Sequence, residues 1–192
     1  MKTITTSLLL LLLITSCKKN ELKQRCTGFT HEEPTIFEPA DYMVWGDVLP
    51  LLGTAPFIIR QNIWPLDSSY NPSIKPDSSD LGFEVDSLVW HAYVKANEKE
   101  EKWKDNFPIS SQLITSSELS CFFQNGFLGW NDYYLIYPRG FWSISRAGIF
   151  GDFALVEYTY SCGSVCGEST CLLLKKEAGK WIIFKQGYTV IS

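Results

Sequence analysis

Hydrophobic and polar residues alternate with a period of two through the last third of the chain. The segments FWSISRAGIF, FALVEYTYSC, CLLLKKE and KWIIFKQGYTVIS, which begin at Phe141, each have the pattern of a β-strand. In the second segment, one face carries Ala154, Val156, Tyr158, Tyr160 and Cys162. The connections FGDF and EAGK are as short as hairpin turns, and strands joined so closely must run antiparallel. The pattern therefore predicts a C-terminal antiparallel meander of about four strands.

Two earlier segments have the pattern of a helix. A short helix is predicted from Pro39 through DYMVWGDVL, and Pro50 is expected to end it because proline interrupts helical hydrogen bonding. A second helix is predicted where apolar residues recur at i, i+3, i+4, i+7 and i+11. The apolar face of this second helix consists of Val85, Leu88, Val89, Ala92 and Ala96.

Two more helices are predicted just before the meander. Ser116 or Ser117 can cap a helix through ELSCFFQ, which Asn125-Gly126 ends. A stripe of aromatic residues at helical spacing then consists of Trp130, Tyr133, Tyr134 and Tyr137. Such a stripe can bind a sugar, but packing of the helix against the sheet explains it better. We expect Trp181, on the last strand, to be buried against this stripe.

The front half of the chain is less regular. PFII, within residues 51–64, has the pattern of a buried strand, and residues 65–80 have the Pro, Ser, Asp and Asn content of a surface loop. Residues 18–35 are polar and lack an apolar period, so residues 17–35 are predicted to be a tether. The whole pattern predicts one α+β domain over residues 36–192, with helices packed on one face of the antiparallel meander.

Composition and charge exclude one class of partner. The chain has 192 residues, is 45% hydrophobic and carries a formal charge of −4. No cluster of Lys and Arg is long enough to bind nucleic acid, and the acidic balance also argues against such a partner. The hydrophobic content is sufficient for the core of one domain.

The N-terminus has the layout of a secretion signal. MKTITTSLLLLLLITSCKKN has one early cation, an apolar run over residues 8–14 and small residues before Cys17. That run is much shorter than the roughly 20 residues that span a membrane. Ile14-Thr15-Ser16-Cys17 resembles the bacterial lipobox, which implies removal of residues 1–16 and acylation of Cys17, with palmitate as a typical acyl chain. Several acyl chains would anchor the protein firmly to a lipid bilayer.

The back half resembles the C-terminal part of certain bacterial envelope lipoproteins over residues 128–192. The similarity lies in WNDYYLIYP, in a Cys-Gly hairpin within WSISRAGIFGDFALVEYTYSCGSVCGE, and in the Gly-Lys-Trp turn and last strand of LLLKKEAGKWIIFKQGYTVIS. The resemblance implies a location in the cell envelope and supports the hairpin register, and it carries over no catalytic residue. Lys18, directly after the acylated cysteine, favours the outer membrane.

Cysteine spacing predicts disulfide bonds rather than a metal site. Acylation of Cys17 leaves five cysteines, an odd number, in an oxidising compartment. The Cys162 to Cys166 turn can reach disulfide geometry, and its spacing lacks the second paired unit of a structural zinc site. Pairing of Cys171 with Cys162 is the alternative. Cys26 and Cys121 form the second predicted pair.

The inventory of reactive residues argues against an enzyme. His31 falls in the tether and His91 lies beside the apolar face of a helix, so neither indicates a catalytic triad. Paired carboxylates of a glycosidase are conceivable in one acidic cluster, although a solvated loop and helix start explain it better. That cluster consists of Asp77, Asp80, Glu84 and Asp86. No catalytic residue, metal site or cofactor is predicted.

Two classes of function stay open at this point. The favoured one is a non-enzymatic envelope lipoprotein whose domain binds another envelope protein or a glycan. The other is a thiol protein that handles a metal or performs redox work with Cys162 and Cys166. The Cys-x₃-Cys spacing resembles the copper pair of periplasmic copper chaperones, although those proteins carry it in a thioredoxin fold.

Overall fold

A computed structural model describes residues 18–63, 81–123 and 129–191 of the chain. Its contacts group the chain into two compact units, called unit 1 (residues 1–31 and 115–139) and unit 2 (residues 32–114 and 140–192). The helices of the described part are residues 18–26, α2 (Pro39–Leu52), α4 (Ser87–Ala96), α5 (Ser116–Phe123) and α6 (Trp130–Ile136).

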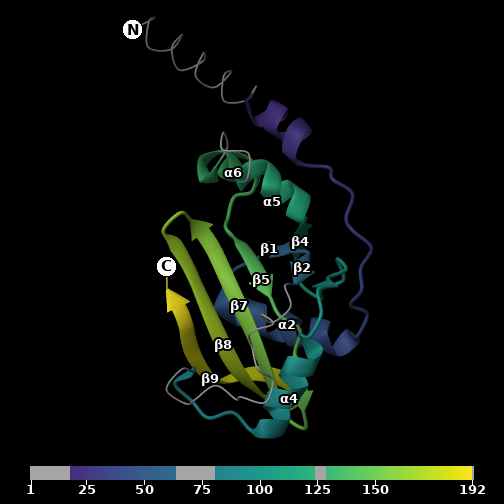
Figure 1. The fold of residues 1–192 in the computed structure, drawn as a ribbon, viewed down its shortest axis with the longest axis vertical. Coiled ribbons are helices and arrows are strands. Elements are labelled where there is room, and N and C mark those ends of the chain that lie inside the picture. The colour runs from purple at the N-terminus through teal and green to yellow at the C-terminus, as the bar shows by residue number, and fades with distance from the viewer. Residues whose placement is uncertain (1–17, 64–80, 124–128, 192) are drawn as a thin grey trace, which may run out of the picture. The chain divides into compact units, whose positions relative to one another are not determined.

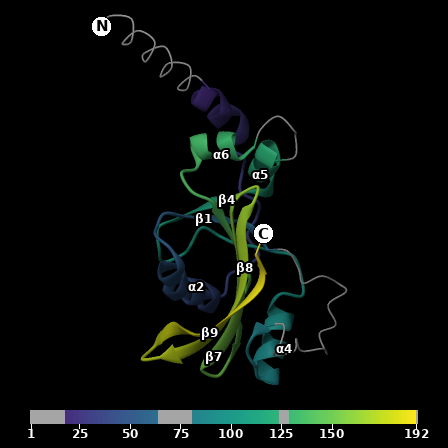
Figure 2. The same cartoon turned by 90° about the vertical axis from the view of Figure 1, so that its left-hand side faces the viewer.

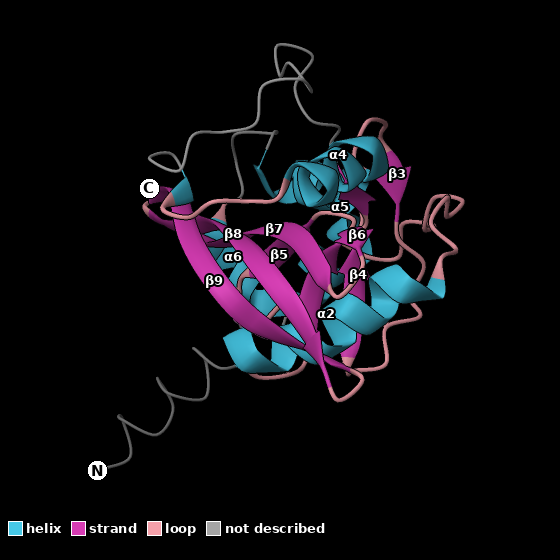
Figure 3. Cartoon of the chain, turned by 90° about the horizontal axis from the view of Figure 1, so that it is seen from below, coloured by secondary structure: helices cyan, strands magenta, loops and turns pink. Residues whose placement is uncertain are grey.

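Unit 2 contains a mixed sheet with the strand order β4-β1-β5-β7-β8-β9, and β6 pairs with β7 (Figure 1). Its strands are β1 (Phe57–Arg60), β4 (Ser111–Ile114), β5 (Phe141–Ile144), β6 (Gly148–Phe150), β7 (Phe153–Gly163), β8 (Cys166–Glu177) and β9 (Lys180–Ile191). A second small sheet pairs β2 (Asn62–Ile63) with β3 (Glu101–Lys102). The long strands β7, β8 and β9 run side by side as a twisted layer (Figure 3).

The predicted α+β class and the C-terminal meander β7–β9 are confirmed. The number of strands is wrong, because the main sheet has seven strands in the described part rather than about four. Part of the difference comes from β1, the predicted PFII strand, which pairs in parallel with both β4 and β5. Parallel partners far apart in the sequence leave no hairpin signal, so four-residue strands of this kind escape a local pattern.

The segment FWSISRAGIF forms two strands instead of one. Between β5 and β6, the backbone N–H of Arg146 donates to the Asn97 side chain at 2.9 Å, and that of Ala147 donates to Asp41 at 2.7 Å. Side chains from two helical regions thus take hydrogen bonds that a continuous strand would give to its neighbour. The strand pattern is interrupted because distant polar groups satisfy its backbone.

Helices lie on both faces of the sheet in unit 2, and the prediction of one covered face is wrong. The core cluster on one face includes Trp45 and Val48 of α2 together with Val156 and Leu172 of the sheet. The opposite face has a second cluster that joins α4 to the sheet (Figure 2). This cluster includes Leu155, Cys171 and Leu173 from the strands and Val89, Trp90 and Tyr93 from α4. Strand β7 therefore buries both of its alternating faces, as strands between two helical layers do.

The apolar face of α4 differs from the predicted one. Leu88 is 52% exposed, whereas Val89, Trp90 and Tyr93 are buried. The helix begins where the Asp86 side chain accepts the Leu88 N–H at 2.8 Å. Aromatic side chains bury more apolar area than Leu or Ala, so Trp90 and Tyr93 determine which face of the helix meets the sheet.

Helix α2 begins at Pro39 as predicted but continues through Pro50 to Leu52. Proline removes a single N–H donor, and only the last turn of the helix depends on it. The N–H of Gly53 donates to the Leu49 carbonyl at 3.1 Å and completes that turn. A proline this close to the end of a helix therefore does not stop it.

In unit 1 the region predicted to be a tether begins with a helix. Residues 18–26 are helical, and Leu22 and Cys26, one turn apart, are its buried residues. Two buried positions among seven polar ones were too few to produce a recognisable apolar period. The predicted single domain over residues 36–192 stays a prediction, since the contacts group residues 115–139 with the N-terminal residues.

The two helices predicted before the meander are present in unit 1 as α5 and α6. Their aromatic side chains pack on one another, with the rings of Tyr133 and Tyr137 stacked at 5.0 Å. Phe122 meets both tyrosine rings edge to face. The aromatic stripe thus forms the core of this unit, and Tyr134, 39% exposed, is its most open tyrosine.

Candidate functional site

The hairpin of β7 and β8 ends in a disulfide-linked turn. Cys162 and Cys166 are bonded, with Cα atoms 5.1 Å apart. Gly163 pairs with Cys166 across the turn, and a Cβ atom at Gly163 would lie 3.2 Å from the Cys166 Cβ, so a larger residue would crowd the turn. Cys166 is exposed, and Val165 beside it is 86% exposed. The turn is therefore a fixed loop with one sulfur and one apolar side chain open to solvent.

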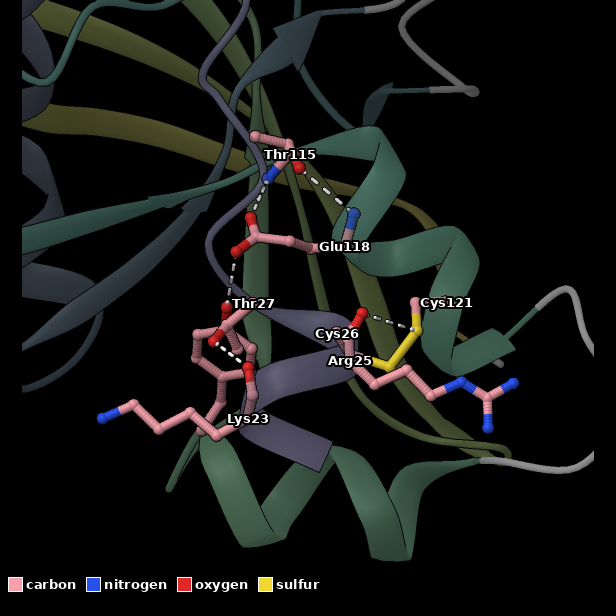
Figure 4. Close-up of a disulfide and its surroundings, with 8 residues drawn as sticks. Lys23, Arg25, Cys26, Thr27, Thr115, Glu118 and Cys121 are labelled. Atoms are coloured by element: carbon pink, nitrogen blue, oxygen red, sulfur yellow. Dashed lines mark hydrogen bonds between the residues drawn. A yellow bond between two sulfur atoms is a disulfide. The ribbon is translucent and has the colours of Figure 1, made fainter. Parts of the chain in front are cut away.

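The second cysteine pair lies in unit 1. Cys26, at the end of the helix over residues 18–26, is bonded to Cys121 of α5, with Cα atoms 5.5 Å apart (Figure 4). Both cysteines are buried, and 95 residues of sequence separate them. The bond therefore fixes the N-terminal helix to α5.

A capping box begins α5, directly after the last strand residue of β4. The Glu118 N–H donates to the Thr115 hydroxyl at 3.1 Å, and the Thr115 N–H donates to the Glu118 carboxylate at 2.8 Å (Figure 4). Thr115 is thus the cap, in place of the predicted Ser116 or Ser117. The other Glu118 oxygen accepts the Tyr137 hydroxyl at 3.2 Å. Burial, followed by the Glu118 charge, raises the pKa of Tyr137, which keeps the phenol protonated as a donor.

The fifth cysteine belongs to a buried polar group in unit 2. Cys171 faces Glu157 in the β7–β8 ladder, and the hydroxyl of Tyr93 donates to Glu157 at 2.9 Å. Burial, and then the Glu157 charge, raises the pKa of the Cys171 thiol. A neutral buried thiol is a poor nucleophile and a poor metal ligand. The alternative pairing of Cys171 with Cys162 does not occur, because Cys162 is already bonded to Cys166.

Glu157 has a raised pKa, as a catalytic acid or base often has, but its carboxylate lies between α4 and the sheet. Burial raises its pKa, and the Tyr93 hydroxyl partly opposes this. Burial also raises the pKa of Tyr93 well above its ordinary value. A shifted pKa indicates a catalytic group only where a substrate can approach, and Tyr93 and Cys171 are both buried. The contact connects α4 to the sheet through one strong hydrogen bond.

A partly buried ion-pair network, in which Asp41 is buried and Glu38 is exposed, links α2 to the segment between β5 and β6. Arg146 donates through Nε and Nη2 to one oxygen of Asp41 at 3.1 and 3.0 Å, and its Nη2 is also 3.0 Å from Glu38. Burial raises the pKa of Asp41, while the Ala147 N–H and Arg146 act in the opposite direction. Burial disfavours the Arg146 charge, but the surrounding carboxylates outweigh it and raise its pKa. Both groups are fully engaged in holding the chain together.

Among the described residues, the histidines and carboxylates that the sequence analysis weighed do not converge on a site. His91 is exposed on α4, with its Nδ1 2.6 Å from the Ser87 carbonyl oxygen, and His31 is exposed in unit 1. Asp86 caps α4 and Glu84 is exposed. Asp77, Asp80 and Cys17 lie outside the described residues.

Trp181 is buried as predicted, at 5% exposure, but among other residues than expected. It belongs to the core cluster of unit 2 that includes Trp45 and Leu49 of α2, and its backbone N–H donates to the Asp47 carboxylate of α2 at 3.0 Å. The aromatic stripe of α6 is absent from this cluster. The beginning of β9 therefore packs on α2 and is hydrogen-bonded to it.

Within the described part of the chain, no three His, Cys, Asp or Glu residues are arranged to hold a metal ion. No helix there is both long and apolar enough to cross a membrane. No protein-family model matches the chain, and no curated protein or solved structure matches it significantly. The residues and their geometry are accordingly the basis for the function proposed below.

Proposed function

We propose that the chain is a lipid-anchored protein of the bacterial cell envelope, attached through acylated Cys17, whose folded part binds another envelope component and is not an enzyme. The observation that carries the proposal is the state of the five cysteines after Cys17: four form two disulfides and the fifth is buried. Disulfides of this kind persist outside the reducing cytosol. The proposal includes sorting to the outer membrane.

The environment of the buried ionisable groups supports a binding or structural role. Asp41, Glu118 and Glu157 each accept hydrogen bonds from groups that connect separate segments of the fold. Their polar atoms are used by the protein itself rather than offered to a substrate. The candidate contact with an envelope protein or glycan is the turn from Cys162 to Cys166, because its conformation is fixed and Val165 is exposed.

Metabolic labelling with palmitate tests the anchor. The wild-type chain should incorporate label and remain with membranes after a high-salt wash, and Cys17→Ser should lose the label and the membrane association. The matched control is Cys162→Ser with Cys166→Ser, which removes two other sulfurs and should keep the label. Full labelling of the Cys17→Ser chain would contradict acylation at this residue.

Thiol chemistry at the hairpin tip is the second candidate function. Exposure of Cys166 and the 5.1 Å separation of the two Cα atoms favour it, because a reduced pair at this distance can bind one copper ion. Titration of the reduced chain with Cu(I) decides the matter, with Cys162→Ser and Cys166→Ser as the control. Stoichiometric binding that the control loses would support metal handling, and absence of binding would remove it.

A further inference from the structure

The charge of the chain is divided unequally between its two units. From Cys17 onward, unit 1 has five Lys and Arg against three Asp and Glu, a formal charge of +2. Unit 2 has eleven Lys and Arg against eighteen Asp and Glu, a formal charge of −7. Two of the three acids of unit 1, Glu118 and Asp132, are buried, so Glu21 is its one exposed acid. The surface of unit 1 is therefore basic in an acidic protein.

Most of this positive charge lies on the helix over residues 18–26. Lys19, Lys23 and Arg25 are exposed, and they flank the stripe of Leu22 and Cys26 that is buried. Figure 4 shows the side chains of Lys23 and Arg25 pointing in opposite directions. The cations are thus free of the core of unit 1 and available to an external anion.

This helix is fixed at both of its ends. Lys18 pairs with Asp132 of α6 at 2.6 Å, and Cys26 is bonded to Cys121 of α5. At about 1.5 Å per residue, the nine helical residues from Lys18 to Cys26 form a helix about 14 Å long, and Cys17 directly precedes it in the sequence. An acylated Cys17 would therefore hold unit 1 close to the bilayer. A flexible tether of the same residues would instead allow unit 1 to move away.

We propose that residues 18–26 lie on an anionic lipid surface, with Lys19, Lys23 and Arg25 contacting headgroup phosphates. The position beside the bilayer rests on the acylation proposed above, whereas the affinity for anionic lipid is a property of the helix itself. Basic residues bind anionic membranes only within about one Debye length, which is about 8 Å at physiological salt. When the helix axis lies along the bilayer surface, as proposed, its cations stay inside this range, whereas a mobile linker would let them move beyond it.

Vesicle binding of the unacylated chain tests the proposal. The complete mature chain with Cys17→Ser, made without residues 1–16, is mixed with vesicles of phosphatidylglycerol and phosphatidylethanolamine at low ionic strength. The chain should sediment with these vesicles and dissociate from them at high salt. It should not bind vesicles of phosphatidylcholine. The triple variant Lys19→Gln, Lys23→Gln, Arg25→Gln should lower the partition coefficient about fivefold per cation, or about 100-fold in all.

A matched control removes three cations from unit 2. Lys95→Gln, Lys99→Gln and Lys180→Gln change the net charge by the same amount at exposed positions and should leave vesicle binding unchanged. Equal binding by both triple variants would overturn the proposal, and so would equal binding of the wild-type chain to neutral vesicles. Preference for a soluble polyanion over the anionic vesicles would also overturn it.

Amine labelling of the acylated chain gives a second readout. In anionic vesicles Lys19 and Lys23 should be protected from an amine reagent, while Lys95 and Lys180 should react as in detergent. Equal labelling of all four would contradict contact with the bilayer. Because the vesicle assay uses an unacylated chain, its failure is distinguishable from absence of palmitate on Cys17.

Discussion

The two disulfides of this protein join cysteines in very different settings. Cys26 and Cys121 are buried, lie 95 residues apart and connect two helices of unit 1. Cys162 and Cys166 lie four residues apart, at the tip of a hairpin whose strands already pair from Phe153 with Lys175 up to Ser161 with Gly167. One bond restricts a large part of the unfolded chain, and the other restricts a single turn.

Loop-closure entropy predicts what this difference means for stability. A disulfide that closes a loop of about 100 residues stabilises the folded state by about 4.7 kcal/mol, and one that closes about 15 residues by about 3 kcal/mol. The turn from Cys162 to Cys166 is smaller still, and the β7–β8 ladder holds it without the bond. The comparison indicates that the N-terminal disulfide stabilises the protein, whereas the hairpin disulfide mainly fixes the local conformation.

The largest effect is expected from Cys26→Ser with Cys121→Ser. The free energy of unfolding should fall by up to about 4.7 kcal/mol, measured by urea denaturation. Amide exchange in residues 18–26 should rise more than exchange in β7 and β8, because the helix loses its covalent attachment. A loss below about 1 kcal/mol would show that the bond contributes little and would remove the contrast between the two disulfides.

Truncation of Trp181 tests whether packing, rather than a disulfide, holds the meander. Trp181→Ala should lower the free energy of unfolding by about 3–5 kcal/mol, as other large core truncations do. The control is Phe184→Ala on the same strand, where the side chain is 50% exposed and the expected loss is much smaller. Equal losses in the two variants would mean that Trp181 does not belong to the core.

Removal of the hairpin disulfide should have a smaller effect than either change. Cys162→Ser with Cys166→Ser should cost less than about 3 kcal/mol in urea denaturation, because the closed loop is far shorter than 15 residues. The variant should keep the β7–β8 ladder and show faster amide exchange only near the tip. Global unfolding of this variant would reverse the comparison. Non-reducing peptide mapping of protein from the envelope provides the control for both bonds.

A fourth variant tests the helix to which the N-terminal disulfide is attached. Thr115→Ala should lower the free energy of unfolding by about 1 kcal/mol, since it removes the cap of α5. Ser117→Ala is the matched control, because Ser117 lies two residues after the cap, is exposed, and should cost nothing measurable when it is truncated. A larger loss of stability for Ser117→Ala than for Thr115→Ala would mean that Ser117 is the cap, as the sequence pattern suggested.

The smallest effect concerns the residue that faces the unpaired cysteine. The folded-state pKa of Glu157 is raised above its ordinary value near 4.5, so its contribution to stability is present below that pH and is lost as the pH rises. Glu157→Gln keeps an acceptor for Tyr93 and removes the buried charge. The melting temperature of the variant relative to wild type should therefore increase from pH 4 to pH 8. A difference that does not change with pH would contradict the raised pKa.

Local patterns were sufficient for the parts of the fold that local hydrogen bonds define. The strands β7, β8 and β9 were predictable because each is joined to the next by a short turn and pairs with it. Their apolar and polar residues also alternate in the sequence. The turn at Ala178 and Gly179 has positive φ at both residues, as a two-residue hairpin requires. Thr115 and Glu118 also form a signature that is visible in the sequence, T-x-x-E, although the neighbouring serines obscured it.

Other features depended on contacts between residues far apart in the chain. The break between β5 and β6 requires Asp41, and the covered face of α4 depends on which side chains meet β7 and β8. The helix over residues 18–26 has only two apolar residues, so its packing against α5 depends on the disulfide between Cys26 and Cys121. Likewise, β1 forms because β4 and β5 supply parallel partners.

The sequence by itself determined the α+β class, the C-terminal meander, the burial of Trp181 and a cysteine inventory that permits two disulfides. Each of these follows from spacing over a few residues or from composition, where short-range geometry dominates. The tertiary structure alone decided the seven-stranded sheet, the two covered faces, the hydrogen bond from Tyr93 to Glu157 and the fixed basic helix before Cys26. These depend on burial and pairing across long sequence separations, which a local pattern does not encode.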